Sequence, residues 1–140
     1  MTKEINKLRN TLSVTIFIFS TLITSFANSE EFVEKYASSK EYDLCIQNVV
    51  ATYDVLACMK TELALQDKVL NENYKKAIKG LDKERRKTLM SAQRSWINYR
   101  DKKCSLYYHE NSGTGGLLDQ EECLIKETIK RSAELFKMFS

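Results

Sequence analysis

Residues 81–107, LDKERRKTLMSAQRSWINYRDKKCSLY, carry the clearest structural pattern in this chain of 140 residues. Their apolar side chains recur at the spacing of an amphipathic helix, which would bury one face against a core. The expected inner stripe consists of Leu81, Leu89, Ala92, Trp96, Tyr99 and Tyr107. We therefore predict a long helix that begins near Asp82.

The segment before it predicts another long helix. Thr52 is a suitable N-cap with Asp54 in the first turn, and Gly80 favours an end after Lys79. Its apolar positions are Leu56, Leu63, Leu70, Tyr74 and Ile78. Because only a short connection at residues 80–82 separates the two helices, they should lie antiparallel.

This antiparallel register predicts specific partners across the two helices. The apolar pairs would be Leu70 with Ala92, and Tyr74 with Leu89. The polar pairs would be Glu62 with Arg100, as an ion pair, and Asn71 with Gln93, as a hydrogen bond.

The C-terminal part predicts a loop followed by a third helix. Residues 110–118, ENSGTGGLL, contain three glycines, which are unfavourable inside a helix. The helix would start at Asp119, with Glu122 three residues later as in a capping box. Its inner face would carry Leu124, Thr128, Arg131, Leu135 and Met138.

The N-terminus has the composition of a secretory signal peptide. Residues 1–11 carry three basic side chains and one acidic one, and residues 12–27, LSVTIFIFSTLITSFA, are apolar or hydroxylic. Ser25 and Ala27 are small residues before a cleavage site, so we expect cleavage near Ala27. An uncleaved anchor is the alternative, although the run is shorter than the roughly 20 residues that span a bilayer.

This organisation predicts three segments: a signal peptide (1–27), a polar lead-in (28–44) and a helical domain (45–140). Residues 41–50 would form a short helix or turn around Cys45. The mature chain would be periplasmic or secreted, with no later apolar run long enough to span a membrane.

Export to an oxidising compartment predicts that the four cysteines form disulfides. Cys45, Cys58, Cys104 and Cys123 would be oxidised, and no CxxC pair indicates a zinc site. We favour bridges 45–58 and 104–123, although the helix register also brings Cys58 beside Cys104. The predicted fold is all-α: a small disulfide-bonded antiparallel bundle of three main helices plus a short N-terminal helix or turn.

No catalytic constellation is recognisable in the sequence. His109 is the single histidine, and no nucleophile can be paired with it. Phosphate-binding glycine motifs are absent as well. We therefore expect a protein that is not an enzyme and uses neither a cofactor nor a metal.

Charge is unevenly distributed along a chain whose formal net charge is only +3. Residues 75–103 contain eleven Lys and Arg against three acidic residues, whereas the remaining mature chain is acidic. Around residues 82–88 this basic stretch has no interleaved aromatic side chains, and the chain is expected to be exported. A nucleic-acid partner is therefore not expected.

Three motifs together are specific enough to indicate a family. The central one is Leu89-x-x-Ala92-Gln93-Arg94-x-Trp96-Ile97-x-Tyr99-Arg100-Asp101-x-x-Cys104. Upstream stands Cys58-x-x-x-Glu62-Leu63-x-x-x-Asp67-x-x-Leu70-Asn71-x-x-Tyr74-Lys75, and downstream Gly115-Gly116 and Cys123-Leu124-x-x-x-Thr128-x-x-Arg131. From Cys45 to about Leu135, the chain closely resembles the LprI-type lysozyme-inhibitor N-terminal domain.

The resemblance implies a small exported helical domain with disulfides and, for the family's naming member, inhibition of lysozyme. It also implies a structural network formed by Glu62, Asn71, Gln93, Trp96, Arg100, Thr128 and Arg131. The chain departs from the family in having Leu117 where Ser often follows the glycine pair. It also lacks the lipidation cysteine of the naming member, which favours a soluble periplasmic protein.

We therefore expect a binding protein that inhibits c-type lysozyme or another peptidoglycan hydrolase. Its acidic end would complement a basic enzyme. The candidate contact residues are His109, Glu110, Gly115, Gly116, Asp119, Glu121 and Glu122. The alternatives are an envelope protein that contacts anionic lipid or lipopolysaccharide through its basic stretch, and an immunity protein against a secreted toxin.

Overall fold

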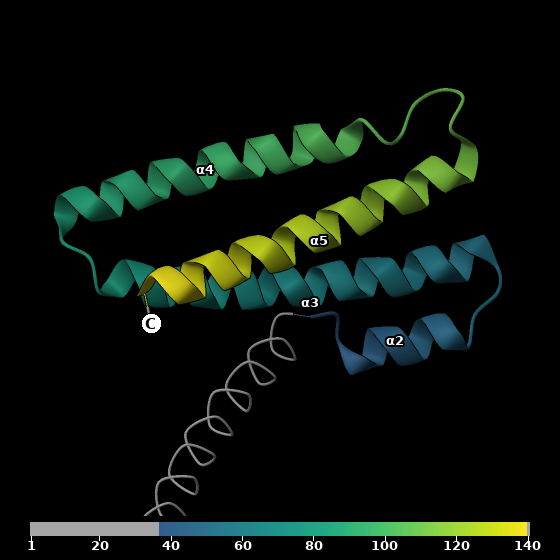
Figure 1. Ribbon diagram of the computed structural model, residues 1–140, viewed down its shortest axis with the longest axis horizontal. Helices are drawn as coiled ribbons and strands as arrows, with labels where there is room; N and C mark the ends of the chain where they lie inside the picture. Colours follow the sequence, from purple (N-terminus) through teal and green to yellow (C-terminus); the bar gives the residue numbers. More distant parts are fainter. Residues whose placement is uncertain (1–36, 140) are drawn as a thin grey trace, which may run out of the picture. The chain divides into compact units, whose positions relative to one another are not determined.

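The protein is an all-helical bundle in the part of the chain that the structure describes. The computed structural model describes residues 37–139. Its helices are α2 (Lys40–Gln47), α3 (Thr52–Lys79), α4 (Lys83–Ser105) and α5 (Gly113–Phe139). Helices α3 and α5 run in the same direction and α4 runs opposite to them (Figure 1). The prediction of three long helices and one short helix is confirmed.

Helix α2 is the short helix expected around Cys45. Ser39 caps it, because the Tyr42 N–H donates a hydrogen bond of 3.1 Å to the Ser39 hydroxyl. The predicted signal peptide lies outside the described residues, as does most of the predicted lead-in. Among the helices of residues 37–139, none has the length and apolar character needed to cross a membrane.

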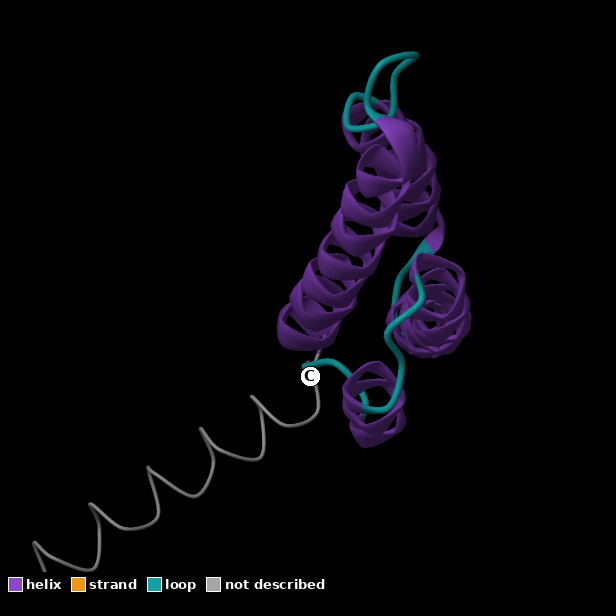
Figure 2. Ribbon diagram, turned by 90° about the vertical axis from the view of Figure 1, so that its right-hand side faces the viewer, coloured by secondary structure: helices purple, strands orange, loops and turns teal. Residues whose placement is uncertain are grey.

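Helix α5 is central to the packing because it contacts both α3 and α4, whereas α2 packs on α3 (Figure 2). The apolar core lies towards the α3–α4 connection and consists of Leu70, Ala77, Leu81, Leu89 and Leu135. Tyr74, Ile78 and Trp96 pack against it from partly buried positions. A core this small leaves much of the stability to other interactions.

The contact between α3 and α5 is partly polar. Asn73 Nδ2 donates to Ser132 Oγ at 2.9 Å, and Ser132 and Thr128 are fully buried. Because these two side chains are small and lie four residues apart, they form one narrow face along which α3 approaches closely. The buried polar groups are stabilised by being paired across the helices.

Several positions expected in the core are exposed instead. These are Ala92 and Tyr99 on α4, Tyr107 just after it, and Met138 near the end of α5. Helix α4 meets α5 but barely touches α3, so its inner face is narrower than predicted. That face consists of Leu89, Gln93, Trp96, Arg100 and Cys104, at spacings of three or four residues.

The ends of α3 and α4 largely follow the sequence signals. Gly80 is the C-cap of α3, as predicted, and α4 begins at Lys83 after its N-cap Asp82, in agreement with the predicted start near Asp82. The prediction that Thr52 caps α3 is wrong, because Thr52 is already helical and Ala51 is the N-cap. The extended Ala51 backbone directs its carbonyl oxygen to the N–H groups of Asp54 and Val55, at 2.9 and 3.1 Å.

The start of α5 differs most from the prediction. The helix begins at Gly113, so the glycines expected in a loop form its first turns, and Asp119 lies inside it. Gly113 enters the helix with a φ of +57°. Gly116 packs so tightly that an added Cβ would lie 2.6 Å from the Tyr107 carbonyl oxygen and 2.5 Å from Ser112 Cβ.

This packing predicts opposite effects for two neighbouring glycines. We expect Gly116→Ala to lower the free energy of unfolding by about 1–3 kcal/mol, because the new methyl group overlaps backbone and Ser112. At Gly115 nothing lies within 4 Å of an added Cβ, so Gly115→Ala should be neutral or stabilise by up to about 1 kcal/mol. Urea unfolding of both variants measures the difference, and equal effects would contradict the packing at Gly116.

The Asp82 cap predicts a pH dependence of stability. Its Oδ1 accepts hydrogen bonds from the N–H groups of Arg85 (2.9 Å) and Glu84 (3.0 Å). The bond from the Arg85 N–H, above all, lowers the pKa of Asp82 below its ordinary value of 3.8. A carboxylate with a lowered folded pKa stabilises the fold above its ordinary pKa, and this contribution is lost as the pH falls through the lowered value.

Asp82→Asn separates the charge from the cap, because the amide oxygen still accepts hydrogen bonds. We expect the original chain to be more stable than this variant at neutral pH, and the difference to shrink well below pH 3.8. Urea midpoints at the two pH values measure it. A difference that stays constant with pH would show that the Asp82 carboxylate is not the titrating group.

Candidate functional site

Two disulfides hold one end of the bundle. Cys45–Cys58 joins α2 to α3 with a Cα–Cα distance of 5.9 Å. Cys104–Cys123 joins α4 to α5 with a distance of 5.5 Å. The favoured pairing is confirmed, and the alternative bridge between Cys58 and Cys104 is not formed. Both bridges lie near the end of the bundle where α2 connects to α3 and α4 connects to α5 (Figure 1).

We define the two-loop end as residues 48–53 and 106–112, which comprise these two connections and the first two residues of α3. It exposes apolar side chains to an unusual degree: Val50 is 99% exposed, Tyr53 81% and Leu106 79%. Tyr107 and Tyr108 are about half exposed beside them. Exposed apolar and aromatic side chains on loops at one end of a protein are a feature of protein-binding surfaces.

Sequence reasoning missed these five residues as a site. Tyr107 was assigned to the core, and the others received no role. A usable signal was present, since Val49-Val50 and Leu106-Tyr107-Tyr108 are apolar runs at the ends of the predicted helices. Helical periodicity gives such runs no partner, so they are either buried by neighbours or exposed for a ligand.

His109 helps to order the second loop. Its N–H donates to Ser112 Oγ (3.0 Å), and its carbonyl oxygen accepts from the Ser112 N–H (2.9 Å). The ring Nδ1 also accepts a hydrogen bond from the Asn111 N–H at 3.3 Å. These bonds make a compact turn, so the loop presents its side chains from a defined backbone.

The candidate contact residues from the sequence divide into two groups. Exposed positions are His109, Glu110, Gly115, Asp119 and Glu122. Glu122 is held by Lys126, whose Nζ lies 2.5 Å from its Oε1. Gly116 is buried and Glu121 is partly buried, with an Oε2 atom that has no hydrogen-bond partner. The burial of Gly116 follows from its packing against residues 107 and 112.

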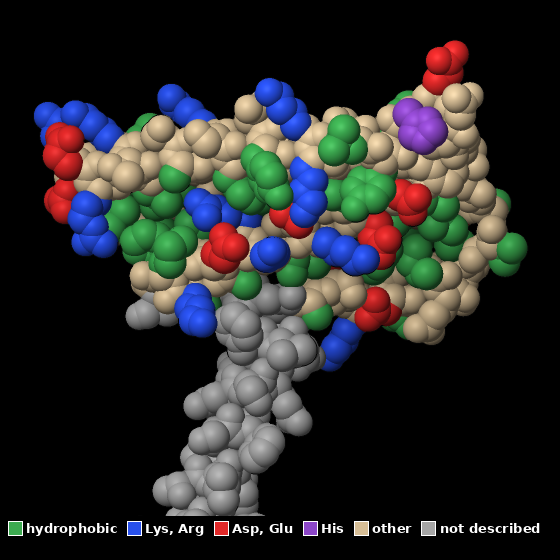
Figure 3. Space-filling view, turned by 45° about the horizontal axis from the view of Figure 1, so that its top comes forward, with side chains coloured by type: hydrophobic (Ala, Val, Ile, Leu, Met, Phe, Trp, Pro, Cys, Tyr) green, Lys and Arg blue, Asp and Glu red, His purple; other side chains and the backbone are tan. Residues whose placement is uncertain are grey.

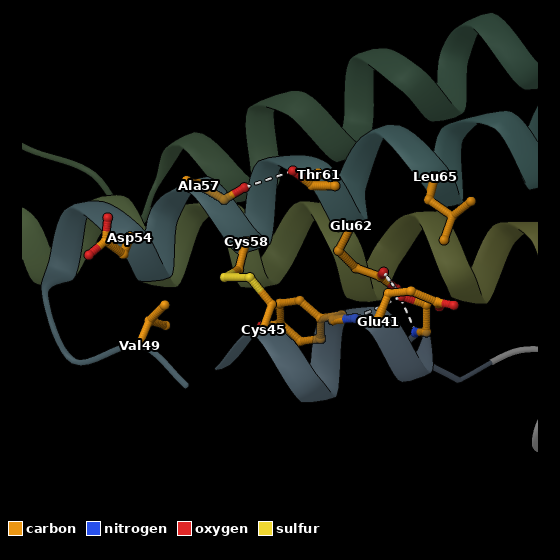
Figure 4. A pocket seen from close by; sticks show the side chains of 11 residues that line it. Glu41, Cys45, Val49, Asp54, Ala57, Cys58, Thr61, Glu62 and Leu65 are labelled. Atoms are coloured by element: carbon orange, nitrogen blue, oxygen red, sulfur yellow. Dashed lines mark hydrogen bonds between the residues drawn. A yellow bond between two sulfur atoms is a disulfide. The ribbon is translucent and has the colours of Figure 1, made fainter. Parts of the chain in front are cut away.

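A groove of about 680 Å³ between α2 and α3 adjoins the two-loop end (Figure 4). Its acidic lining residues are Glu41, Asp54 and Glu62, and none of the described residues that line it is Lys, Arg or His. Tyr42 also lines the groove, and its burial, followed by the charge of Glu122, raises the pKa of its phenol. The groove is therefore apolar in its walls and negative in its charge.

Glu62 fixes α2 to α3 at this groove. Its carboxylate accepts hydrogen bonds from the Ser39 N–H (2.9 Å), the Ser39 hydroxyl (2.5 Å) and Gln66 Nε2 (2.7 Å). The predicted ion pair with Arg100 is wrong. Asp67 follows Glu62 by five residues, which is about 140° around the helix. Glu62 therefore faces α2, and Asp67 faces α4.

Arg100 connects the three long helices. Its Nη1 donates to Asp67 Oδ1 on α3 (3.0 Å) and to Thr128 Oγ1 on α5 (2.9 Å). Its Nε donates to Asp101 Oδ1 (3.0 Å), and the guanidinium carbon lies 5.2 Å from the centre of the Trp96 ring. The arginine is thus a structural group, with few donors left for a ligand.

A second arginine continues this network along α5. Arg131 Nε donates to Gln93 Oε1 at 3.0 Å, and its guanidinium carbon lies 5.9 Å from the Trp96 ring. The predicted hydrogen bond between Asn71 and Gln93 is therefore wrong. Both residues line a separate cleft of about 380 Å³ between α3 and α4, but α5 supplies the partner of Gln93.

All four cysteines are in disulfides, so none offers a thiol. Within residues 37–139, no three His, Cys, Asp or Glu side chains come together in a way that could hold a metal ion. The fold and the site define a class of protein: a small disulfide-bonded helical module with exposed apolar side chains at one end.

Comparison with protein-family models identifies the family. Residues 45–135 match the family described as Lysozyme inhibitor LprI, and the chain belongs to this family. The matched segment contains both disulfides together with Glu62, Arg100 and Arg131, whereas Ser39, which bonds Glu62, lies before it. Searches of curated proteins and of solved structures found no match.

Proposed function

We propose that the protein is exported and inhibits a cationic peptidoglycan hydrolase of the lysozyme class, which it binds through the two-loop end. The observation that carries this proposal is the exposure of Val50 and Leu106 on two connections, and of Tyr53 in the first turn of α3, each near a disulfide. Family membership supports the kind of target.

The rigidity of the two-loop end supports tight binding. Association loses affinity when flexible loops must be ordered, and a preorganised surface avoids much of this cost. Large apolar and aromatic side chains at the centre of an interface supply most of the binding free energy. Tyr53, Tyr107 and Tyr108 combine apolar area with a hydroxyl group that can bond across the interface.

The exposed carboxylates near the two-loop end support the proposal of a basic target. Glu110 and Asp119 are exposed, and neither forms an ion pair within the described residues. The neighbouring groove adds Glu41 and Asp54. Lysozymes are typically basic, so these carboxylates would accelerate association and favour the correct orientation. Inhibition would follow from covering the enzyme's cleft, which requires no catalytic group in this protein.

Export fits both the disulfides and the predicted leader. Disulfides persist in oxidising compartments, and the family is described as an inhibitor of lysozyme, an enzyme that cleaves peptidoglycan outside the cytoplasm. We propose a periplasmic or secreted mature protein that starts after cleavage near Ala27. Lysozyme would meet it in that compartment.

A cell-wall lysis assay tests the proposal. The oxidised protein should inhibit c-type lysozyme in a dose-dependent way. The triple variant Val50→Ser, Tyr53→Ser, Leu106→Ser should raise the concentration for half inhibition at least about 30-fold, because interface anchors are lost. These side chains are mostly exposed, so the fold should remain intact by circular dichroism.

A matched control removes three exposed apolar side chains from α4: Met90→Ser, Ile97→Ser, Tyr99→Ser. This variant should inhibit as well as the original chain. Lack of inhibition by the original chain at micromolar excess would refute the function. Inhibition that survives the two-loop variant, or is lost equally in the control, would refute the site.

A further inference from the structure

The end of the bundle at the α3–α4 connection is strongly basic. Residues 75–87 contain seven Lys and Arg against two acidic residues, and all nine are exposed. Basic side chains gather at this end in Figure 3, at the left of the view. It lies opposite the two-loop end, because α3 ends and α4 begins there.

The acidic residues at this end are already engaged. Asp82 caps α4, and Glu84 Oε1 lies 3.2 Å from Lys87 Nζ. Arg86 donates to the Leu81 carbonyl oxygen at 3.2 Å. The remaining five cations form no ion pair within the described residues. We call them the hairpin-end cations: Lys75, Lys76, Lys79, Lys83 and Arg85.

Exposed apolar side chains accompany these cations. Met138 is 56% exposed and Phe139 37% exposed in the last turn of α5. This turn lies at the same end, because Leu135, one turn earlier, packs in the core with Ala77 and Leu81. The C-terminal end of α5 is also drawn beside the α3–α4 connection in Figure 1.

We propose that this end binds the surface of an anionic phospholipid membrane. Clustered basic side chains with adjacent apolar groups are the pattern by which proteins bind anionic bilayers without spanning them. Four of the five hairpin-end cations are lysines, whose flexible point charges suit a diffuse layer of phosphates better than a fixed carboxylate partner. Bound in this way, the protein would direct its two-loop end away from the membrane.

Sedimentation with lipid vesicles tests this inference. The purified protein with its disulfides formed should bind vesicles of phosphatidylcholine and phosphatidylglycerol, and not vesicles of phosphatidylcholine alone. Raised salt should weaken the binding. Each basic side chain near an anionic membrane surface raises the partition coefficient about fivefold. The variant Lys75→Gln, Lys79→Gln, Lys83→Gln, Arg85→Gln should therefore lower the partition coefficient at least about 100-fold.

The matched control removes the same number of charges elsewhere: Lys60→Gln, Lys68→Gln, Lys102→Gln, Lys130→Gln. These lysines are exposed and form no ion pair within residues 37–139. The control should bind vesicles nearly as well as the original chain, and circular dichroism should show both variants folded. Equal losses in the two variants, or equal binding to neutral vesicles, would overturn the proposal.

The apolar contribution has its own test. Met138→Ser with Phe139→Ser should weaken vesicle binding roughly tenfold while leaving its salt dependence in place. An unchanged partition coefficient would overturn the role of the last turn of α5. If the protein bound heparin as tightly as it binds the vesicles, the basic end would be a general polyanion-binding surface, and the proposal of a membrane partner would be overturned. The hairpin-end variant should keep its inhibition of lysozyme, since the two ends are separate.

Discussion

Loss of both disulfides is expected to leave the protein largely unfolded. The change is Cys45→Ala, Cys58→Ala, Cys104→Ala and Cys123→Ala together, or treatment of the original chain with a reductant. The bridges span 13 and 19 residues, and each contributes about 3 kcal/mol by restricting the unfolded chain. Small domains have a total stability of about 5–15 kcal/mol, so the expected loss of about 6 kcal/mol is a large share.

The small core makes this loss severe. Its apolar cluster lies towards the α3–α4 connection, while both disulfides lie towards the two-loop end. Thermal melts followed by circular dichroism measure the effect. The pair Cys45→Ala, Cys58→Ala should release α2 and keep the long helices, which distinguishes local from global loss. A reduced protein with its original helix content and melting temperature would contradict the account.

Arg100→Ala is expected to lower the free energy of unfolding by about 3 kcal/mol. The substitution removes bonds to Asp67 and Thr128 on two different helices and uncovers the Trp96 ring. Hydrogen bonds of a charged group are each worth about 1.5–3 kcal/mol, but Asp67 and Asp101 are 43% and 55% exposed, which screens their share. The buried Thr128 hydroxyl would lose its donor.

Urea unfolding of two further variants shows whether the loss of stability comes from the bonds of the Arg100 guanidinium. Arg94→Ala removes an exposed arginine from the same helix and should change stability by less than about 0.5 kcal/mol. Arg100→Lys should be intermediate, because an ammonium group cannot reproduce the planar guanidinium geometry. If Arg100→Ala and Arg94→Ala had equal effects, Arg100 would not be the connection between the helices.

The helices themselves were predictable because their signals are local. Apolar periodicity, the Asp82 cap and Gly80 located α3 and α4 to within a residue or two. The start of α5 was not predicted correctly, because the low helix propensity of glycine indicated a loop at residues 110–118. Tertiary contact overrides that propensity at Gly116, where the absence of a side chain allows the helix to pack against the preceding loop.

Partners across helices were less predictable than the helices. The predicted Glu62–Arg100 pair assumed that α3 and α4 pack directly on each other. Because α5 packs against both, Arg100 reaches Asp67 and Thr128, and Glu62 turns to α2. The exposure of Val50, Tyr53 and Leu106 was also not predicted, because helical periodicity does not show whether apolar residues at the ends of helices are buried or exposed.

Hydrogen–deuterium exchange of the oxidised protein, with and without saturating c-type lysozyme, tests the central claim most directly. Lysozyme binding at the two-loop end should slow amide exchange at residues 48–53 and 106–112 and leave residues 75–87 unchanged. Unchanged exchange throughout the chain, or protection confined to residues 75–87, would contradict binding through the two-loop end.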